Sequence, residues 1–121
     1  MFDIFHNGVL IGRSELEGGD PPMGVASGRF EPTQAFAPLR MVMKPARDGF
    51  GKEMRDMRCL EGVRTRTENG TMLVCSLAQV CEYGEADKPF AWEMFCFGIE
   101  HPLYEELFPH HVEAYKNQFK K

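Results

Sequence analysis

The stretch Phe2-Asp-Ile-Phe-His-Asn-Gly-Val-Leu-Ile-Gly-Arg-Ser14 decides the fold, because it predicts the first β-hairpin of the chain. Its Asn7-Gly8 dipeptide separates two runs in which apolar residues alternate. A type I′ turn needs positive φ at both central residues, which Asn and Gly tolerate. A two-residue loop places Ile4 opposite Ile11 and gives the core face four apolar side chains. These side chains are Phe2, Ile4, Val9 and Ile11.

A second dipeptide, Asn69-Gly70, predicts another hairpin, between Cys59–Thr67 and Met72–Tyr83. The same geometry places Arg66 opposite Leu73. Met72–Tyr83 is apolar on both faces, which is typical of a central strand covered on both sides. Its partner contains arginines and is expected nearer an edge of the sheet.

The remaining segments have weaker patterns. Ala91–Glu100 predicts a further central strand, and Val25–Glu31 a short strand in which Gly28 marks a bulge or a close backbone approach. A helix is expected to begin at Pro32 and to be kinked or ended by Pro38. Lys52–Arg58 is expected to form a helical turn with its methionines inside.

Apolar residues recur at helical spacing between Pro102 and Lys120, and Pro109 divides this region into two segments or one kinked helix. Together these elements predict an α+β fold in a single domain that spans residues 1–121. The expected architecture is a single antiparallel or mixed twisted sheet of about five to seven strands. It is built on the two Asn-Gly hairpins, with the C-terminal helix packed on one face.

Composition and cysteine usage indicate a cytoplasmic protein. The 121 residues, 43% of them hydrophobic, suffice for a core without a metal or a disulfide. The N-terminus lacks the pattern of a signal peptide, and no apolar run is long enough to cross a membrane. The four cysteines lie in apolar runs, where reduced cysteines behave as small hydrophobic residues. They are Cys59, Cys75, Cys81 and Cys96.

The charge of the chain is unevenly distributed. A net charge of −4 and a pI near 5.6 argue against nucleic-acid binding, which relies on positive charge facing phosphates. Between Arg40 and Arg66 eight basic residues stand against four acidic ones, a local charge of +4. Between Glu82 and Glu113 eight acidic residues stand against Lys88 alone, a local charge of −7.

No catalytic residue, metal site or cofactor is predicted, because no motif with known mechanics occurs. Adjacent histidines such as His110 and His111 point about 100° apart on a helix and cannot easily share one ion. Cys96 and His101 are five residues apart along an expected strand, too far for a thiolate–imidazole pair unless the chain folds back.

Two arginines are the candidate ligand-binding residues. Arg64 and Arg66 share a strand face, where they either bind a phosphate or carboxylate or keep an edge strand from aggregating. A rigid loop, Asp20-Pro-Pro-Met-Gly24, is either a recognition element or a stiff connector.

The leading hypothesis is a small protein-binding module, of the inhibitor, immunity-protein or adaptor kind, that engages a basic protein through acidic surface. The candidate partner-binding residues are Asp20, Glu105, Glu106 and Glu113. The alternative is a small-ligand-binding protein or enzyme, whose pocket between sheet and helix is lined by Arg64, Arg66 and His101. A third hypothesis is a homodimer formed through an edge strand.

Overall fold

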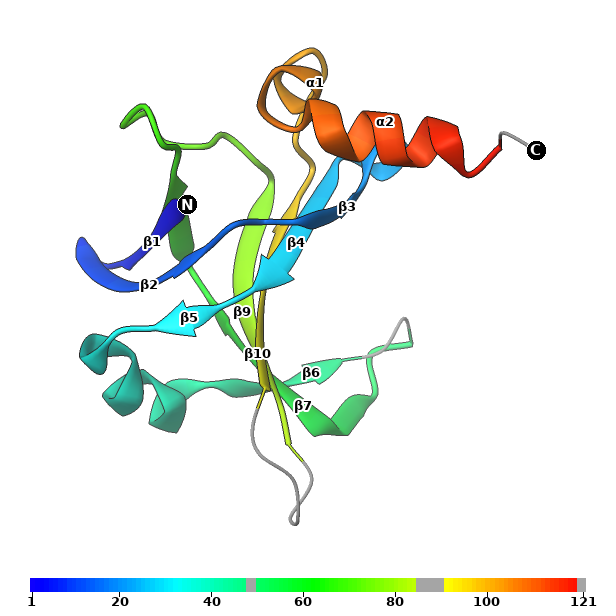
Figure 1. The fold of residues 1–121 in the computed structure, drawn as a ribbon. Helices are drawn as coiled ribbons and strands as arrows, with labels where there is room; N and C mark the ends of the chain where they lie inside the picture. The colour runs from blue at the N-terminus through cyan, green and yellow to red at the C-terminus, as the bar shows by residue number, and fades with distance from the viewer. Residues whose placement is uncertain (48–49, 85–90, 120–121) are drawn as a thin grey trace.

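The computed structural model describes residues 1–47, 50–84 and 91–119, and it contains two antiparallel sheets where the sequence predicts one (Figure 1). The four-stranded sheet has the order β5-β2-β1-β8, with bounds Glu31–Pro32, Val9–Ser14, Phe2–His6 and Val63–Arg66. The six-stranded sheet has the order β3-β4-β10-β9-β7-β6. Its strands are Gly18–Asp20, Val25–Arg29, Ala91–Phe97, Leu77–Tyr83, Glu53–Glu61 and Lys44–Arg47.

The expected single sheet is wrong because three continuous stretches of chain cross from one sheet to the other. β2 leads to β3 through Leu16, β4 leads to β5 through Phe30, and β7 leads to β8 through Gly62. Leu16 and Gly62 adopt positive φ, 47° and 77°, which bends the chain there. A periodic pattern does not reveal such a bend, so Cys59–Thr67 looks like one strand in the sequence. Bends of this kind form the corners of packed sheets.

The first hairpin departs from its expected register, and the bend at Leu16 lies close to Gly28. Asn7 and Gly8 form the two-residue turn between β1 and β2, with φ of 50° and 79°. A bulge then shifts the register, so Ile4 pairs with Gly12 rather than with Ile11. The expected core face is wrong in one position, since Val9 is 52% exposed. The close approach predicted at Gly28 is confirmed, because a Cβ there would lie 2.8 Å from the Cα of Leu16.

The turn at Asn69-Gly70 reverses the chain as well, but it does not join two long strands. Thr67 N donates to Thr71 O across a three-residue loop in which Gly70 has a φ of 91°. Arg66 therefore bridges to Met72 and not to the predicted Leu73. Residues 73–76 are irregular, and β9 begins only at Leu77 and pairs with β7 and β10.

The region between the hairpins corrects two expectations. The predicted helix from Pro32 is a 3₁₀ helix, η2 (Gln34–Val42), which continues through Pro38. The predicted helical turn Lys52–Arg58 is wrong, since these residues belong largely to β7, which pairs with both β6 and β9. Pairing on both sides overrides the local preference of the segment. Met54, expected inside, is 41% exposed.

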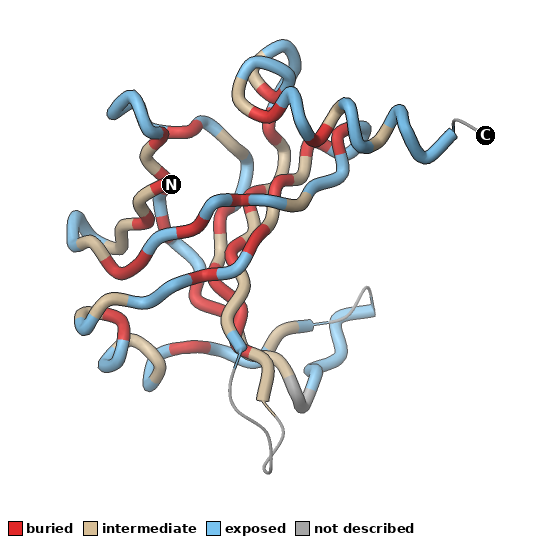
Figure 2. The backbone as a smooth tube through the Cα atoms, in the orientation of Figure 1, coloured by how far each residue is buried: buried red, intermediate tan, exposed pale blue. Residues whose placement is uncertain are grey.

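The C-terminal region is helical and is divided at Pro109, as predicted. A short 3₁₀ turn, η1 (Pro21–Met23), packs beside α2 (Pro109–Asn117), which also contacts α1 (Leu103–Leu107) and β3. Most of α2 is exposed, whereas the buried residues concentrate where the two sheets face each other (Figure 2). No helix in the described part of the chain is long and apolar enough to cross a membrane.

We expect Gly12→Ala to destabilise the protein, because Phe30, at the bend between β4 and β5, packs against Gly12. A Cβ at Gly12 would overlap the Phe30 ring and lie 2.6 Å from the carbonyl oxygen of Glu31. Overpacking of this kind costs roughly 1–3 kcal/mol. Chemical denaturation measures the change in unfolding free energy.

Gly18→Ala is the matched control, because a Cβ at Gly18 meets no atom closer than 3.5 Å. It should be neutral or stabilising by up to about 1 kcal/mol. Equal stability of the two variants would contradict the role assigned to Gly12.

Candidate functional site

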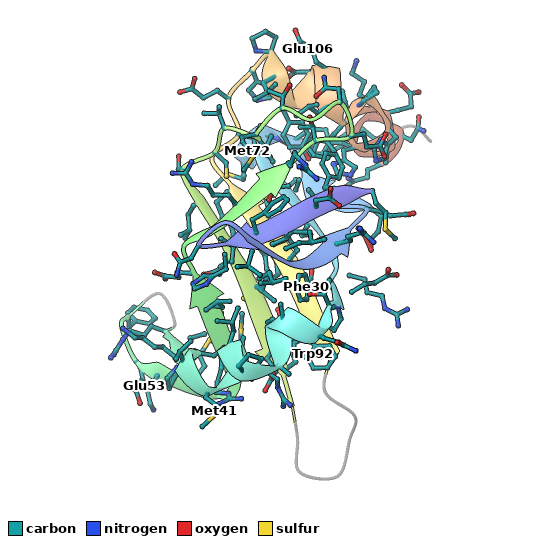
Figure 3. All side chains as sticks on the ribbon, turned by 90° about the vertical axis from the view of Figure 1, so that its left-hand side faces the viewer. Phe30, Met41, Glu53, Met72, Trp92 and Glu106 are labelled. Atoms are coloured by element: carbon teal, nitrogen blue, oxygen red, sulfur yellow. The ribbon has the colours of Figure 1, made fainter. Side chains whose placement is uncertain are left out.

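Five exposed carboxylates lie at one end of the molecule, on β3, on α1, on α2 and on the segment that precedes α1. We call this surface the acidic end: Asp20, Glu100, Glu105, Glu106 and Glu113. The elements that hold these residues touch one another. Figure 3 shows Glu106 at this end of the molecule, with Met41 and Glu53 at the opposite end. Histidines aside, Lys116 is the one basic residue among the described residues of β3, η1, α1 and α2.

Most of these carboxylates are available to a partner. Glu105 lies against Nδ1 of His101 one helical turn before it. The side chains of Asp20, Glu106 and Glu113 make no hydrogen bond or ion pair with residues 1–47, 50–84 or 91–119. The structure therefore brings the four predicted partner-binding residues to one end of the molecule and leaves three of them unpaired within its described part.

A fixed loop positions Asp20 at this end. Gly24 N donates to Pro21 O at 3.0 Å, and Ile99 N donates to Gly24 O at 2.9 Å. Gly24 has a φ of 65°, and a Cβ there would lie 2.6 Å from the carbonyl oxygen of Ile99. Only glycine fits this contact, so the proline loop is locked onto the chain that follows β10.

A buried tyrosine–histidine pair holds the helices of the acidic end against the sheet. Tyr104, fully buried in α1, donates its hydroxyl hydrogen to Val25 O at 2.7 Å. Nδ1 of His111 in α2 lies 2.9 Å from the same hydroxyl, and the His111 ring stacks on Phe108 with centroids 4.7 Å apart. A Cβ at Gly19 would overlap the Tyr104 hydroxyl and lie 2.6 Å from Nδ1 of His111. The glycine of β3 thus admits both polar groups.

The pair is neutral. Because the Tyr104 hydroxyl donates to Val25 O, His111 must donate from Nδ1, which leaves Nε2 as a bare acceptor. This Nε2 atom is buried and has no hydrogen-bond partner in the described part of the chain. Burial, with a smaller effect from His110, lowers the pKa of His111, and burial raises the pKa of Tyr104 to about 12. Both groups are therefore uncharged near neutral pH, and we assign the pair a structural role.

A second surface lies on the four-stranded sheet, at the turn between β1 and β2 and along β8. We call it the arginine groove, which has a volume of about 590 Å³. Its lining residues are Phe5, Asn7, Gly8, Gly62, Val63, Arg64, Arg66 and Met72. The guanidinium of Arg66 stands 4.8 Å from the centre of the Phe5 ring, a cation–π contact.

Asp3 fixes Arg66 in the groove. Its carboxylate accepts from Arg66 at 2.7 Å and from Arg13 at 3.0 Å, and these hydrogen bonds, Arg66 first, lower the pKa of Asp3. Arg64 pairs with Phe5 in the strand register and is exposed, with no ion pair to any described residue. One arginine of the groove is therefore held by an ion pair, and the other has none with a described residue.

His101 does not belong to the arginine groove. It is exposed beside α1, where it contacts Glu105, and its ring centroid lies 6.1 Å from that of Tyr104. The structure brings Arg64 and Arg66 together, as the alternation of β8 predicts, but places His101 at the acidic end. None of the described residues that line the groove belongs to a helix, so the expected pocket between sheet and helix is not the one that these arginines form.

A buried ion cluster around Glu82 in β9 is not predicted by the sequence. The Glu82 carboxylate, 2% exposed, accepts from Nε of Arg40 at 2.6 Å, from Arg58 at 2.7 Å and from the indole N–H of Trp92 at 2.9 Å. Arg40 comes from η2, and its guanidinium lies 5.8 Å from the Trp92 ring centre. Figure 3 shows Trp92 beside this helix. The cluster ties η2 to the six-stranded sheet.

The cluster is structural, because both carboxylate oxygens are occupied. Burial alone would raise the pKa of Glu82, but the hydrogen bonds from Arg40, Arg58 and Trp92 outweigh it and hold the pKa at about 2. A signal for this position exists in the sequence: Glu82 continues the alternation of Ala78 and Val80, which point into the core. Glu82 therefore does not act with the other acidic residues of 82–113, of which Glu85 and Asp87 lie outside the described residues.

Known proteins provide no template for these surfaces. No protein-family model, no curated protein and no solved structure matches the chain. Within residues 1–47, 50–84 and 91–119, no three potential metal ligands of the His, Cys, Asp or Glu type lie together. The function is therefore inferred from the charge and shape of the surfaces alone.

We expect Glu82→Gln to destabilise the protein by roughly 1–3 kcal/mol, because it leaves two arginines facing an uncharged amide. The free energy of unfolding at pH 7, from chemical denaturation, measures this loss. Glu53→Gln is the control: Glu53 pairs with Arg47 on the surface, at 3.4 Å, and its loss should change little.

The same pair of proteins gives a pH test. Because folding lowers the pKa of Glu82 from 4.5 to about 2, its stabilising effect is complete above 4.5 and disappears as the pH falls towards 2. Wild-type protein should therefore lose stability over this range, and the Glu82→Gln variant should lose less. Parallel stability curves for the two proteins would contradict the structural role of the cluster.

Proposed function

We propose that the protein is a protein-binding module that docks a basic partner through the acidic end. The observation that supports this most directly is the meeting of Asp20, Glu106 and Glu113, from three separate elements, on one surface without cationic partners in the described part of the chain. Unpaired carboxylates of this kind raise the rate of association with a basic surface and discriminate against acidic ones.

The acidic end also has an apolar contact point. Met23, at the tip of the proline loop in η1, is 69% exposed, and η1 packs beside α2. An exposed apolar side chain on an acidic surface is consistent with the anatomy of protein interfaces, in which an apolar centre supplies affinity and a polar rim supplies orientation. Methionine is well suited to the centre, because its flexible thioether adapts to different surfaces.

Rigidity favours this surface as a recognition element. The proline loop is locked by Gly24 and Ile99, and the helices are anchored through Tyr104 and His111. A surface that is already ordered loses little conformational entropy when a partner binds. This anchoring supports a recognition role for the proline loop over that of a stiff connector, since a connector needs no such anchoring.

We expect the triple variant Glu105→Gln, Glu106→Gln, Glu113→Gln to lose its partner. Tagged wild-type and variant proteins are incubated with native lysate at low salt, and the retained proteins are quantified by mass spectrometry. A basic protein retained by the wild type, and released as salt screens the charges, should be depleted on the variant. With the purified partner, the association rate constant should fall on the order of tenfold.

The control variant neutralises three exposed acids outside the acidic end, Glu15, Glu31 and Glu61. It has the same net charge as the test variant and should behave like wild type. If both variants lose the partner equally, overall charge and not the acidic end determines binding. If all three proteins retain the partner equally, the acidic end is not the docking surface.

A second function is supported by the arginine groove: binding of a small anion with an apolar part. Arg64 is unpaired within the described chain, Arg66 is pre-oriented by Asp3, and Met72, 39% exposed, and Phe5 offer apolar contacts beside them. Two guanidinium groups next to an apolar wall suit a phosphate or carboxylate on an aromatic ring.

Phenyl phosphate is the probe for this groove. Backbone amide shifts on titration should map to Phe5, Gly8 and Gly62, and Arg64→Gln should weaken binding about tenfold. Arg29→Gln, an exposed arginine of β4 outside the groove, is the control and should bind as the wild type does. Shifts that are absent, or unchanged by Arg64→Gln, would exclude an anion site here.

A further inference from the structure

The four cysteines of the chain meet in two pairs. Cys59 and Cys81 stand directly opposite each other on the antiparallel strands β7 and β9, and their Sγ atoms lie 2.7 Å apart. Cys75, in the irregular segment before β9, lies beside β10, because Ser76 N donates to Phe97 O at 2.8 Å, and it packs against the core that contains Cys96. The Sγ atom of Cys96 also lies 3.5 Å from the hydroxyl of Thr65. Cys59 and Cys81, opposite each other with their sulfur atoms in contact, can form a bond without strand movement.

We propose that these pairs are an oxidisable site, which a peroxide or a low-molecular-weight disulfide converts into the two disulfides Cys59–Cys81 and Cys75–Cys96. Four cysteines allow three pairings, and the structure selects one of them. This modification is independent of the acidic end and of the arginine groove.

The other two pairings are excluded by the geometry of the six-stranded sheet. Cys81 pairs with Glu93 across β9 and β10, whereas Cys96 pairs with Ala78. Positions 78 and 81 of β9 differ in parity, so their side chains point to opposite faces of the sheet. Cys59 shares the face of Cys81, and Cys75 lies on the side of Cys96. A disulfide between the pairs would have to pass through the sheet.

Each pair has one thiol that attacks and one that resolves. Cys59 lines a groove of about 830 Å³ between β6 and β7, and Cys75 is half-buried, whereas Cys81 and Cys96 are fully buried. The hydrogen bond from Cys96 lowers the pKa of Cys75 to about 7, and the hydrogen bond from Cys81 lowers the pKa of Cys59. The pKa values of Cys81 and Cys96 are raised by their partner thiols and by burial. The thiols with the lower pKa values, Cys59 and Cys75, are thus also the ones that an oxidant can reach.

With a peroxide, the thiolate of Cys75 attacks one oxygen, so that an S–O bond forms and the O–O bond breaks. The leaving oxygen takes up a proton as water or an alcohol. The Cys96 thiol then attacks the sulfenic sulfur, the S–O bond breaks, and water leaves with the Cys96 proton. The pair loses two electrons, and the peroxide gains them. Cys59 and Cys81 follow the same steps.

The test oxidises reduced, folded protein with hydrogen peroxide, then unfolds it in the presence of N-ethylmaleimide so that buried thiols are also blocked. Disulfides are mapped by mass spectrometry of unreduced peptides. We expect Cys59–Cys81 and Cys75–Cys96 linkages, with no labelled thiol in the fully oxidised protein. Any other intramolecular linkage, sulfinic acid at Cys75 in place of a disulfide, or four thiols that remain labelled would overturn the proposal.

Two serine variants separate the pairs. Cys75→Ser changes a half-buried residue and should leave Cys96 as a labelled thiol while Cys59–Cys81 still forms. Cys59→Ser should leave Cys81 labelled while Cys75–Cys96 still forms. If Cys59→Ser does not fold, the Cys75→Ser variant decides the other pair: failure of the Cys59–Cys81 disulfide to form on oxidation of that variant would overturn the proposal.

Discussion

The structure depends on three bends. At each bend a continuous segment of chain leaves a strand of one sheet and enters a strand of the other. Each bend has its own physical requirement. Gly62 adopts a φ that side chains disfavour, Phe30 turns against a glycine in β2, and Leu16 is held with its backbone N–H on the hydroxyl of Ser14 at 3.1 Å. Without the bends, the two sheets would have no common core, and the apolar faces of β1 and β9 would be left exposed to water.

The bends also position the two candidate surfaces. β3 begins directly after the bend at Leu16 and brings Asp20 beside α2, and β8 begins directly after Gly62 and brings Arg64 and Arg66 beside Phe5. The acidic end and the arginine groove therefore lie on different parts of the molecule and do not share residues. This separation permits a macromolecular partner at one surface and a small anion at the other.

The acidic residues between Glu82 and Glu113 have two different roles. Glu82 is buried and its carboxylate is fully used by Arg40, Arg58 and Trp92, so it contributes to stability and not to recognition. Glu106 and Glu113 are exposed on short helices and contribute to the field outside the protein. A count of charges along the chain adds these groups together, although only the fold determines which of them a partner can reach.

The sequence by itself determined the features that depend on neighbouring residues. The turn at Asn7 and Gly8 follows from which residues tolerate positive φ, the division of the C-terminal helices follows from Pro109, and the shared face of Arg64 and Arg66 follows from strand alternation. The tertiary structure alone decided the second sheet, the burial of Glu82 and the pairing of Cys59 with Cys81. These features join distant residues, 22 positions apart for Cys59 and Cys81 and 42 for Arg40 and Glu82. No local preference encodes a contact that forms only when distant segments pack together.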